Sequence, residues 1–406
     1  MSISAHDIRK AADLLDGHII RTPMVQAPVL SRMFGCDLSL KLECQQYTSS
    51  FKARGAFVAL AALDETQRKN GVIAMSAGNH AQAVAYHAET LGIPAVIVMP
   101  AQTPFAKIAR TRRYGAEVVL EGRNLNECED TVAALVKSRQ LTLIHPYDDE
   151  LVMMGQGTAG LEMLTDAPDL DILLVPIGGG GLIGGIATIA RDINPDIEII
   201  GVQTEQYPAM KLALAGDDIV CGGETLAEGI AVKKPGAVTT PVVNDLVDDI
   251  LLVSEQSLEW AVGVLIEEQR IVSEGAGAAG IAAIHQHPEV FAGKKVGTVI
   301  CGGNIDPRLL ASILNRNMAS DGRIVRLRID ISDEPGMLAA ITESIGRCGG
   351  NIVEIYHQRM FYDVPAKLAK IDAVIETRGA EHVDEIIDDL KRAKFIVRKL
   401  DDSDGG

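Results

Sequence analysis

The stretch DILLVPIGGGGLIGGIATIARDI, residues 171–193, decides the fold. It opens with an apolar run typical of a strand that is buried on both faces, as in a parallel sheet. A turn of four glycines follows (Gly178, Gly179, Gly180 and Gly181), and then an apolar pattern at helical spacing. A turn that needs positive φ explains one or two glycines but not four. Their N–H groups can converge on one anion at the start of the helix, so we predict a phosphate site.

The same turn also matches the fingerprint of dinucleotide-binding proteins, through Gly179, Gly181 and Gly184. Glu205 ends the next apolar run about 20 residues further on, where such proteins place a ribose-binding acid. Taken alone, this stretch therefore leaves a dinucleotide and a simpler phosphate-bearing cofactor open.

Strand and helix patterns alternate on both sides of this stretch. Short apolar runs bounded by small residues lie at 71–78, 94–100, 116–122, 195–205 and 294–304. Buried strands that alternate with helices predict parallel α/β structure with helices on both faces of each sheet. We expect two such α/β halves to face each other across a cleft.

Lys52 lies in the segment TSSFKARGA, residues 48–56, between Phe51 and Ala53. This composition suits a turn into a helix that presents one amine to a pocket. Desolvation there, beside a cation such as Arg54, would lower the pKa of the amine and allow it to react with a carbonyl group. A lone lysine of this kind is more commonly a surface residue in a turn.

A second segment ends a strand and begins a helix with Ser76, Ala77, Gly78, Asn79 and His80. Backbone N–H groups at such a helix start, together with a hydroxyl and an amide, favour binding of a carboxylate. Ordinary capping of the helix by Ser76 or Asn79 is the alternative, and we expect a structural role for His80. Cys301 ends another strand, where a thiol can contact a ligand ring or simply fill the core.

In this order, SSFKARGA, SAGNHAQAVA, GGGGL and CGGN resemble the fold-type II pyridoxal-phosphate enzymes, and among them the threonine dehydratases (threonine ammonia-lyases). The resemblance covers residues 5–320 and implies pyridoxal 5′-phosphate as the cofactor. The implied cofactor contacts are Lys52 as the covalent carrier, Phe51 beside the ring, Asn79 at the 3′-oxygen, Gly178–Gly181 at the phosphate and Cys301 at the pyridine nitrogen. Ser76–His80 would hold the carboxylate of an amino-acid substrate. The resemblance thus favours the cofactor phosphate over a dinucleotide.

Serine racemases resemble the chain over the same segments. The resemblance implies that a racemase uses a serine just before Gly-Asn-His as its second acid–base, whereas this chain has Ala77 there. A neutral group such as Cys301 at the ring nitrogen leaves a weaker electron sink, which favours loss of a group from Cβ. The implied reaction releases ammonia from threonine, and also from serine. Serine racemase, 3-hydroxyaspartate ammonia-lyase and a non-catalytic amino-acid sensor stay open as alternatives.

Some relatives hold a divalent metal through a glutamate, a backbone carbonyl and an aspartate. Glu205 and Ala209 could match the first two positions, but Lys211 stands where the second acid is expected. Because a cation there would meet a like charge, we predict no required metal.

The C-terminal part reads as a separate domain. We predict a catalytic domain at 1–318, a polar linker near 315–325, and a regulatory domain at 319–406 with the βαββαβ order of ferredoxin-like modules. The segment RLRIDISDEPGMLAAITESIGRCGGNIVEI resembles an ACT domain, which implies an amino-acid effector bound between two copies. Pro335 is expected as the first residue of its first helix. The candidate regulatory residues are Asp333, Gly336, Asn351 and Ile352, which could alternatively only shape turns.

Composition and charge limit the binding partners and the cellular location that we expect. The formal net charge of -17 disfavours binding to nucleic acid or an anionic membrane, since both need clustered basic residues. No run approaches the roughly 20 apolar residues of a membrane span, and the N-terminus lacks the pattern of a signal peptide. The six cysteines are scattered without a CxxC pair. We therefore expect a cytoplasmic enzyme with reduced thiols, forming a homodimer or homotetramer.

Overall fold

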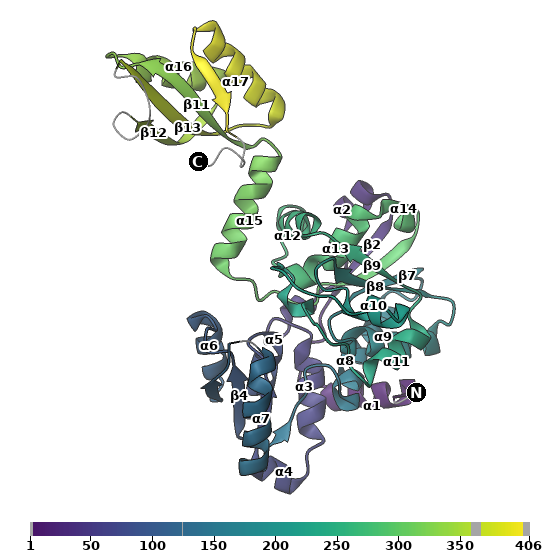
Figure 1. Ribbon diagram of the computed structural model, residues 1–406. Helices are drawn as coiled ribbons and strands as arrows, with labels where there is room; N and C mark the ends of the chain where they lie inside the picture. Colours follow the sequence, from purple (N-terminus) through teal and green to yellow (C-terminus); the bar gives the residue numbers. More distant parts are fainter. Residues whose placement is uncertain (1–2, 124, 359–366, 401–406) are drawn as a thin grey trace. The chain divides into compact units, whose positions relative to one another are not determined.

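The computed structural model describes residues 3–123, 125–358 and 367–400 (Figure 1). The chain separates into two compact units, Met1–Asp306 and Pro307–Gly406. The division falls before helix α15 (Pro307–Ser320), and residues 318 and 319 both lie inside that helix. The prediction of a polar linker at 315–325 is thus wrong for residues 315–320, which belong to α15. Ile313 supplies the buried contact of α15, so its other positions can be polar without breaking the helix.

The smaller sheet of the first unit is parallel, with the strand order β5-β4-β3-β6. Alternate residues of its strands pack on opposite faces: Val72 and Ala74 belong to the core beneath α3 and α5, whereas Ile73 belongs to the core beneath α7. Figure 1 shows β4 together with α5 and α7 in this part of the unit. Its elements are α3 (Lys52–Ala61), α4 (Glu65–Asn70), β3 (Val72–Met75), α5 (Asn79–Leu91), β4 (Ala95–Met99), α6 (Phe105–Arg112), β5 (Glu117–Leu120), α7 (Leu125–Arg139) and β6 (Thr142–Leu143).

The larger sheet has the order β1-β2-β10-β7-β8-β9, and its strands are parallel except for the β1–β2 pair. Two successive residues of β10 show that helices cover both faces: Gly297 packs against Met163 of α8, and Thr298 against Gly280 of α13. The strands are β1 (Met24–Gln26), β2 (Asp37–Lys41), β7 (Ile172–Pro176), β8 (Glu198–Thr204), β9 (Asp249–Val253) and β10 (Lys295–Val299).

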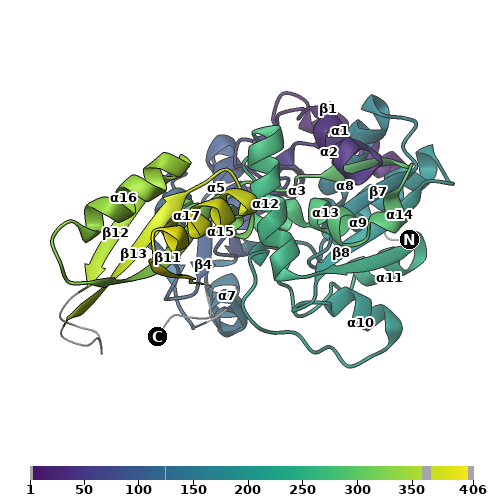
Figure 2. The ribbon, with the colours of Figure 1, turned by 90° about the horizontal axis from the view of Figure 1, so that it is seen from above.

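The helices around this sheet include α8, α9 and α13, whose arrangement beside β7 and β8 can be followed in Figure 2. Their bounds are α1 (Ala5–Leu15), α2 (Pro28–Phe34), η1 (Glu43–Gln45), α8 (Glu150–Asp166), α9 (Gly181–Ile193), α10 (Ala209–Ala215), η2 (Glu228–Ile230), α11 (Thr239–Leu246), α12 (Glu255–Gln269), α13 (Gly275–Gln286) and α14 (Pro288–Phe291). The parallel α/β architecture predicted from the sequence is confirmed.

The second unit contains an antiparallel sheet in the order β12-β13-β11-β14, with the βαββαβ element order expected from the sequence. Its core joins one face of the sheet to two helices through residues such as Leu327, Ile345 and Ile386. After α15, its elements are β11 (Ile324–Ser332), α16 (Met337–Cys348), β12 (Asn351–Gln358), β13 (Leu368–Glu376), α17 (Ala380–Arg392) and β14 (Ile396–Lys399).

Pro335 is not the first residue of α16, so that prediction is wrong. The helix begins at Met337, and Gly336 caps it with a φ of 92°. A left-handed residue cannot belong to a right-handed helix, so the helix can begin only after Gly336. No helix in the described part of the chain is long and apolar enough to cross a membrane.

Candidate active site

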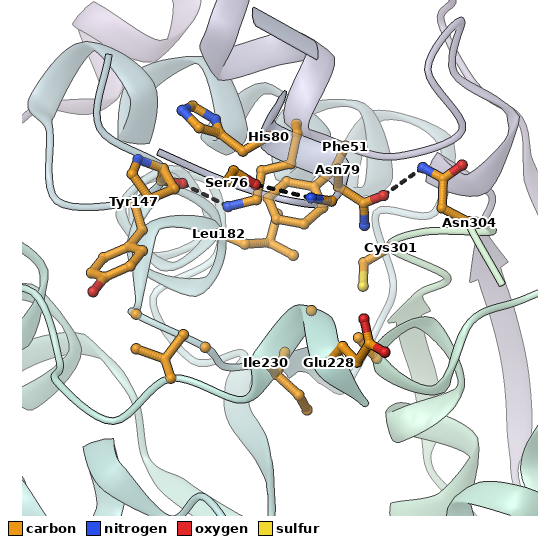
Figure 3. A pocket seen from close by; sticks show the side chains of 18 of the residues that line it. Phe51, Ser76, Asn79, His80, Tyr147, Leu182, Glu228, Ile230, Cys301 and Asn304 are labelled. Carbon is orange, nitrogen blue, oxygen red and sulfur yellow. Dashed lines mark hydrogen bonds between the residues drawn. The ribbon is translucent and has the colours of Figure 1, made fainter. Parts of the chain in front are cut away.

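A cavity of about 330 Å³ lies in the first unit, where β3, β7 and β10 end (Figure 3). Open α/β sheets bind ligands at the carboxyl ends of their parallel strands. Every cofactor and substrate residue predicted from the sequence lines this cavity: Phe51, Lys52, Ser76, Ala77, Gly78, Asn79, His80, Gly178, Gly179, Gly180, Gly181 and Cys301. Segments that are far apart in the chain therefore meet at one site.

Lys52 is the first residue of α3, and its amine faces the cavity. Its Nζ donates a hydrogen bond of 2.6 Å to the carbonyl of Pro146 and lies 5.0 Å from the centre of the Phe51 ring. Removal from water lowers the pKa of Lys52 to about 8, although nearby Cys301 and Glu274 act in the opposite direction. Roughly a tenth of the amine is therefore uncharged and nucleophilic at pH 7, far more than for a lysine with the ordinary pKa of 10.5.

Arg54 is not the cause of this shift, contrary to the prediction. Its guanidinium is fully buried and makes ion pairs with Glu43 at 2.7 Å and with Glu162 at 2.8 Å. Glu162 also pairs with Lys41 of β2. These charges compensate each other inside the core and connect the first turn of α3 to β2 and α8.

Backbone pairing holds the Lys52 segment against the Cys301 segment. Phe51 N donates to Cys301 O at 3.0 Å, and Gly303 N donates to Ser49 O at 2.9 Å. The buried Cys301 thiol lines the cavity, and burial raises its pKa well above the usual range. The thiol is therefore a neutral group at this position, as predicted.

The glycine turn joins β7 to α9, and close contacts explain its composition. A Cβ on Gly179 would stand 2.1 Å from the ring of Tyr147, and Gly180 has a φ of 97°. Thr239 Oγ1 donates to Gly179 O at 2.5 Å and steadies the turn. The first N–H groups of a helix have no partner within it, and here they lie at the cavity. This arrangement suits an anion such as a phosphate.

The second predicted segment forms the start of α5. Gly78 is the cap residue, with no side-chain capping bond, and Ser76 Oγ instead accepts from Gly78 N at 3.2 Å. Capping by Ser76 or Asn79 is therefore not the role of this segment. The buried His80 ring donates from Nε2 to Ile144 O at 2.8 Å, and burial, aided by Lys52, lowers its pKa to about 3. His80 is thus a neutral, structural residue of the cavity wall.

Sequence reasoning gave no role to two polar residues beside Asn79. Asn79 Nδ2 donates to Glu274 Oε1 at 2.7 Å, and Asn304 Nδ2 donates to Asn79 Oδ1 at 2.5 Å. The only signals were an acid just before the small-residue helix α13 and the final letter of CGGN. At the rim of the cavity, Lys107 of α6 pairs with Glu228 of η2 at 2.5 Å.

Three residues on which the dinucleotide and metal alternatives depend do not line the cavity: Gly184, Glu205 and Lys211. Glu205 is exposed and does not line the cavity, and a Cβ on Gly184 would stand 2.9 Å from Met153 of α8, so this glycine allows close helix packing. Lys211 Nζ donates to Ile250 O. Within the described ranges, no group of three His, Cys, Asp or Glu side chains is placed to hold a metal ion.

An enclosed amine with a lowered pKa, an anion-binding glycine turn and a neutral thiol together define an enzyme that bonds a phosphate-bearing carbonyl cofactor. A comparison with protein-family models matches residues 15–302 to the family described as pyridoxal-phosphate dependent enzyme. The chain belongs to this family, and its cofactor is pyridoxal phosphate.

The chain is similar to proteins of known activity. It is 42% identical to an L-threonine ammonia-lyase of Thermotoga maritima, over 95% of this chain and 96% of the relative. The solved structure of maize serine racemase is 33% identical with a TM-score of 0.74, covering 79% of this chain and 99% of the other. The processed form of threonine deaminase isoform 2 from Solanum lycopersicum is 33% identical with a TM-score of 0.72, covering 77% and 86%.

The residues of the cavity fit pyridoxal phosphate. Lys52 supplies an amine for the aldehyde, and the helix start at Gly180 and Gly181 supplies N–H groups for the phosphate. Bulkier residues at Gly179 would collide with Tyr147 and distort this turn. Cys301 offers the pyridine nitrogen a neutral partner.

Proposed function

We propose that this chain is a threonine ammonia-lyase, which converts L-threonine to 2-oxobutanoate and ammonia and acts on L-serine as a second substrate to give pyruvate. The observation that carries the proposal is the Lys52 amine, enclosed in the cavity with a pKa of about 8. The names of the relatives from Thermotoga maritima and Solanum lycopersicum support the choice of substrate.

The reaction follows from what the cavity residues can do. When bound, pyridoxal phosphate withdraws electrons from the substrate Cα and so makes its proton acidic. Lys52 is the base that removes this proton, because its uncharged amine lies in the cavity. The N-terminal amides of α5 at Asn79 and His80, with the Ser76 hydroxyl as a further donor, bind the substrate carboxylate. The β-hydroxyl would then leave as water by taking the proton that Lys52 now carries, and water would hydrolyse the released enamine to the 2-oxo acid and ammonia.

Ala77 favours elimination over racemisation. Racemisation requires a second group that returns a proton to the opposite face of Cα. Ala77 lines the cavity with a methyl group, which cannot carry a proton. We therefore attribute the similarity to maize serine racemase to the shared fold, and we expect little D-serine from this chain.

Replacing Lys52 with Ala tests the proposed reaction. We expect loss of the visible absorbance of the bound cofactor and a fall of at least roughly 10³-fold in 2-oxo acid release from threonine, because both depend on the amine. Lys69→Ala is the matched control, since Lys69 is an exposed lysine of α4. Unchanged 2-oxo acid release by Lys52→Ala would disprove the assignment, and faster release from serine than from threonine would reverse the proposed preference.

We propose further that the second unit is an ACT-type regulatory domain. Asp333 follows the end of β11, where Ser332 pairs with Leu368, whereas Asn351 pairs with Glu376 at the other end of the sheet. At about 3.4 Å per residue, the two ends are roughly 25 Å apart. Asp333 and Gly336 can therefore share one effector site with Asn351 and Ile352 only if a second copy contributes, which fits a homodimer or homotetramer.

Effector binding is measured by calorimetry on the full chain, with isoleucine, valine, serine and threonine as separate ligands. We expect isoleucine to bind, because the product of threonine dehydration feeds its synthesis. Asn351→Ala removes an amide that bonds to Glu376 at 2.9 Å and should weaken binding at least tenfold. Absence of heat for isoleucine and valine, and of any heat from serine and threonine beyond that of the active site, would leave the domain as an oligomerisation module and disprove the effector proposal.

A further inference from the structure

Beyond the proposed reaction, one carboxylate in the cavity wall has no part in the chemistry so far described. We propose that Glu274 is a positioning residue, which orients the Asn79 amide so that one of its N–H groups faces the cofactor ring. Glu274, Asn79 and Asn304 form a continuous hydrogen-bonded chain along the cavity. Figure 3 shows the Asn79 amide beside Cys301 and bonded to Asn304.

The backbone carbonyl of Thr48 fixes which groups donate and which accept along this series of hydrogen bonds. Thr48 O can only accept, so the group of Asn304 that lies 3.0 Å away must be its NH₂. The same NH₂ meets Asn79, which must therefore present its oxygen there. The NH₂ of Asn79 is left to face Glu274 and the cavity. It has two hydrogens, of which Glu274 takes one, so the second is available to an acceptor in the cavity.

Two glycines leave room for the Glu274 carboxyl. A Cβ on Gly302 would stand 2.4 Å from its Oε1, and one on Gly229 would stand 3.1 Å away. Two donors reach the carboxyl, the Asn79 side chain and the backbone N–H of Asn304. Since both groups donate, the ionised carboxylate accepts them better than a protonated acid, which has less accepting capacity.

The pKa of the Glu274 carboxyl lies well above its ordinary value. Burial raises its pKa to about 7, and the bond from Asn79 opposes that shift. Among the charged and titratable groups around it, Glu228 of η2 raises the pKa and Lys107 of α6 lowers it. Lys52 and Cys301 across the cavity, and Cys44 of η1, also interact with the carboxyl. Below about pH 7 the carboxyl gains a proton and the acceptor for Asn79 weakens.

The test follows the Asn79 side chain directly. In cofactor-free protein labelled with ¹⁵N-asparagine, we expect the side-chain amide resonance of Asn79 to shift with a midpoint near pH 7, because Glu274 changes its charge there. Asn79→Asp assigns the resonance by removing it. In Glu274→Gln the midpoint should vanish, whereas it should persist in Glu228→Gln, which removes a neighbouring carboxylate without touching the amide. A midpoint near pH 7 that is retained in Glu274→Gln, and also in the double variant Glu274→Gln, Lys52→Met that removes the titration of Lys52 near pH 8, would overturn the proposal.

A second readout uses cofactor binding. We expect Glu274→Gln to weaken pyridoxal phosphate binding about tenfold above pH 7 in equilibrium dialysis, and to remove the pH dependence of the cofactor absorbance near 7. Glu274→Asp keeps the charge and should restore part of both. Equal affinity and unchanged pH dependence in Glu274→Gln would contradict the role. Neither readout needs threonine, so failure here is separable from failure of the proposed reaction.

Discussion

Lys52 holds its amine in an environment that disfavours the charged form. The unfolded chain protonates this lysine below its ordinary pKa of 10.5, but the folded chain does so only below about 8. Between these values the unfolded state binds more protons, so this contribution makes stability rise with pH. Below about pH 8 the lysine destabilises the folded state by up to about 3 kcal/mol.

We therefore predict that Lys52→Met stabilises the cofactor-free protein at pH 7, and that the gain disappears as the pH rises through 8 towards 10.5. Urea unfolding of both proteins at these two ends of the range measures the difference. A gain that stays constant over this range would show that packing of the methionine, rather than the lowered pKa, is responsible.

Ala77→Ser provides the hydroxyl that racemisation requires. We predict that this variant forms D-serine from L-serine at least ten times faster than the original chain and still releases pyruvate. Chiral chromatography of the amino-acid pool and coupled detection of pyruvate measure the two products. Ala83→Ser, within α5 but outside the cavity lining, controls for an added hydroxyl. If Ala77→Ser produces no D-serine, another feature of the cavity prevents racemisation.

At the scale of single elements, the glycine turn between β7 and α9 permits one substitution that tests the phosphate site. Gly179→Ala places a methyl group against the Tyr147 ring, 2.1 Å from its nearest atom. We predict at least tenfold weaker binding of pyridoxal phosphate, because the turn must shift. Equilibrium dialysis measures the affinity. Gly222→Ala, where a Cβ meets nothing within 4 Å, should leave it unchanged. Equal affinity in both variants would place the phosphate elsewhere.

The elements that carry the cavity were predictable because each one has a recognisable local sequence pattern. A buried strand, small residues and then a helix were expected around Ser76–His80 and Gly178–Gly181, and the structure has β3 followed by α5 and β7 followed by α9. The parallel arrangement puts each turn at the carboxyl edge of its own sheet, and the two turns meet because the two α/β halves face each other, as expected from the sequence.

Features that depend on distant partners were not predictable in this way. Glu274 and Asn304 acquire their roles only through contacts with Asn79, which lies 195 and 225 residues away in the chain. Arg54 was expected beside Lys52 because it is close in sequence, yet its partners Glu43 and Glu162 come from other elements. The start of α16 depended on the backbone of Gly336, which overrides the preference of Pro335 for a first helical position.

At the scale of the whole molecule, the division into two units predicts that catalysis and regulation are separable. Every residue that lines the cavity belongs to Met1–Asp306. A chain that ends at Asp306 should therefore release 2-oxobutanoate from threonine but lose any response to isoleucine. Initial rates with and without isoleucine, for the full and the shortened chain, measure this. A shortened chain that retains native circular dichroism but no activity would show that the second unit is needed for catalysis itself.

The pairing of Ser49–Phe51 with Cys301–Gly303 also governs when the enzyme can first take up its cofactor during synthesis. Lys52 leaves the ribosome early, but its segment pairs with Cys301–Gly303, which are made some 250 residues later. The contact cannot form until then. At roughly 5–20 residues per second, the lysine waits of the order of ten seconds or more in a nascent chain. We therefore expect uptake of pyridoxal phosphate to coincide with completion of the catalytic unit and to report on it.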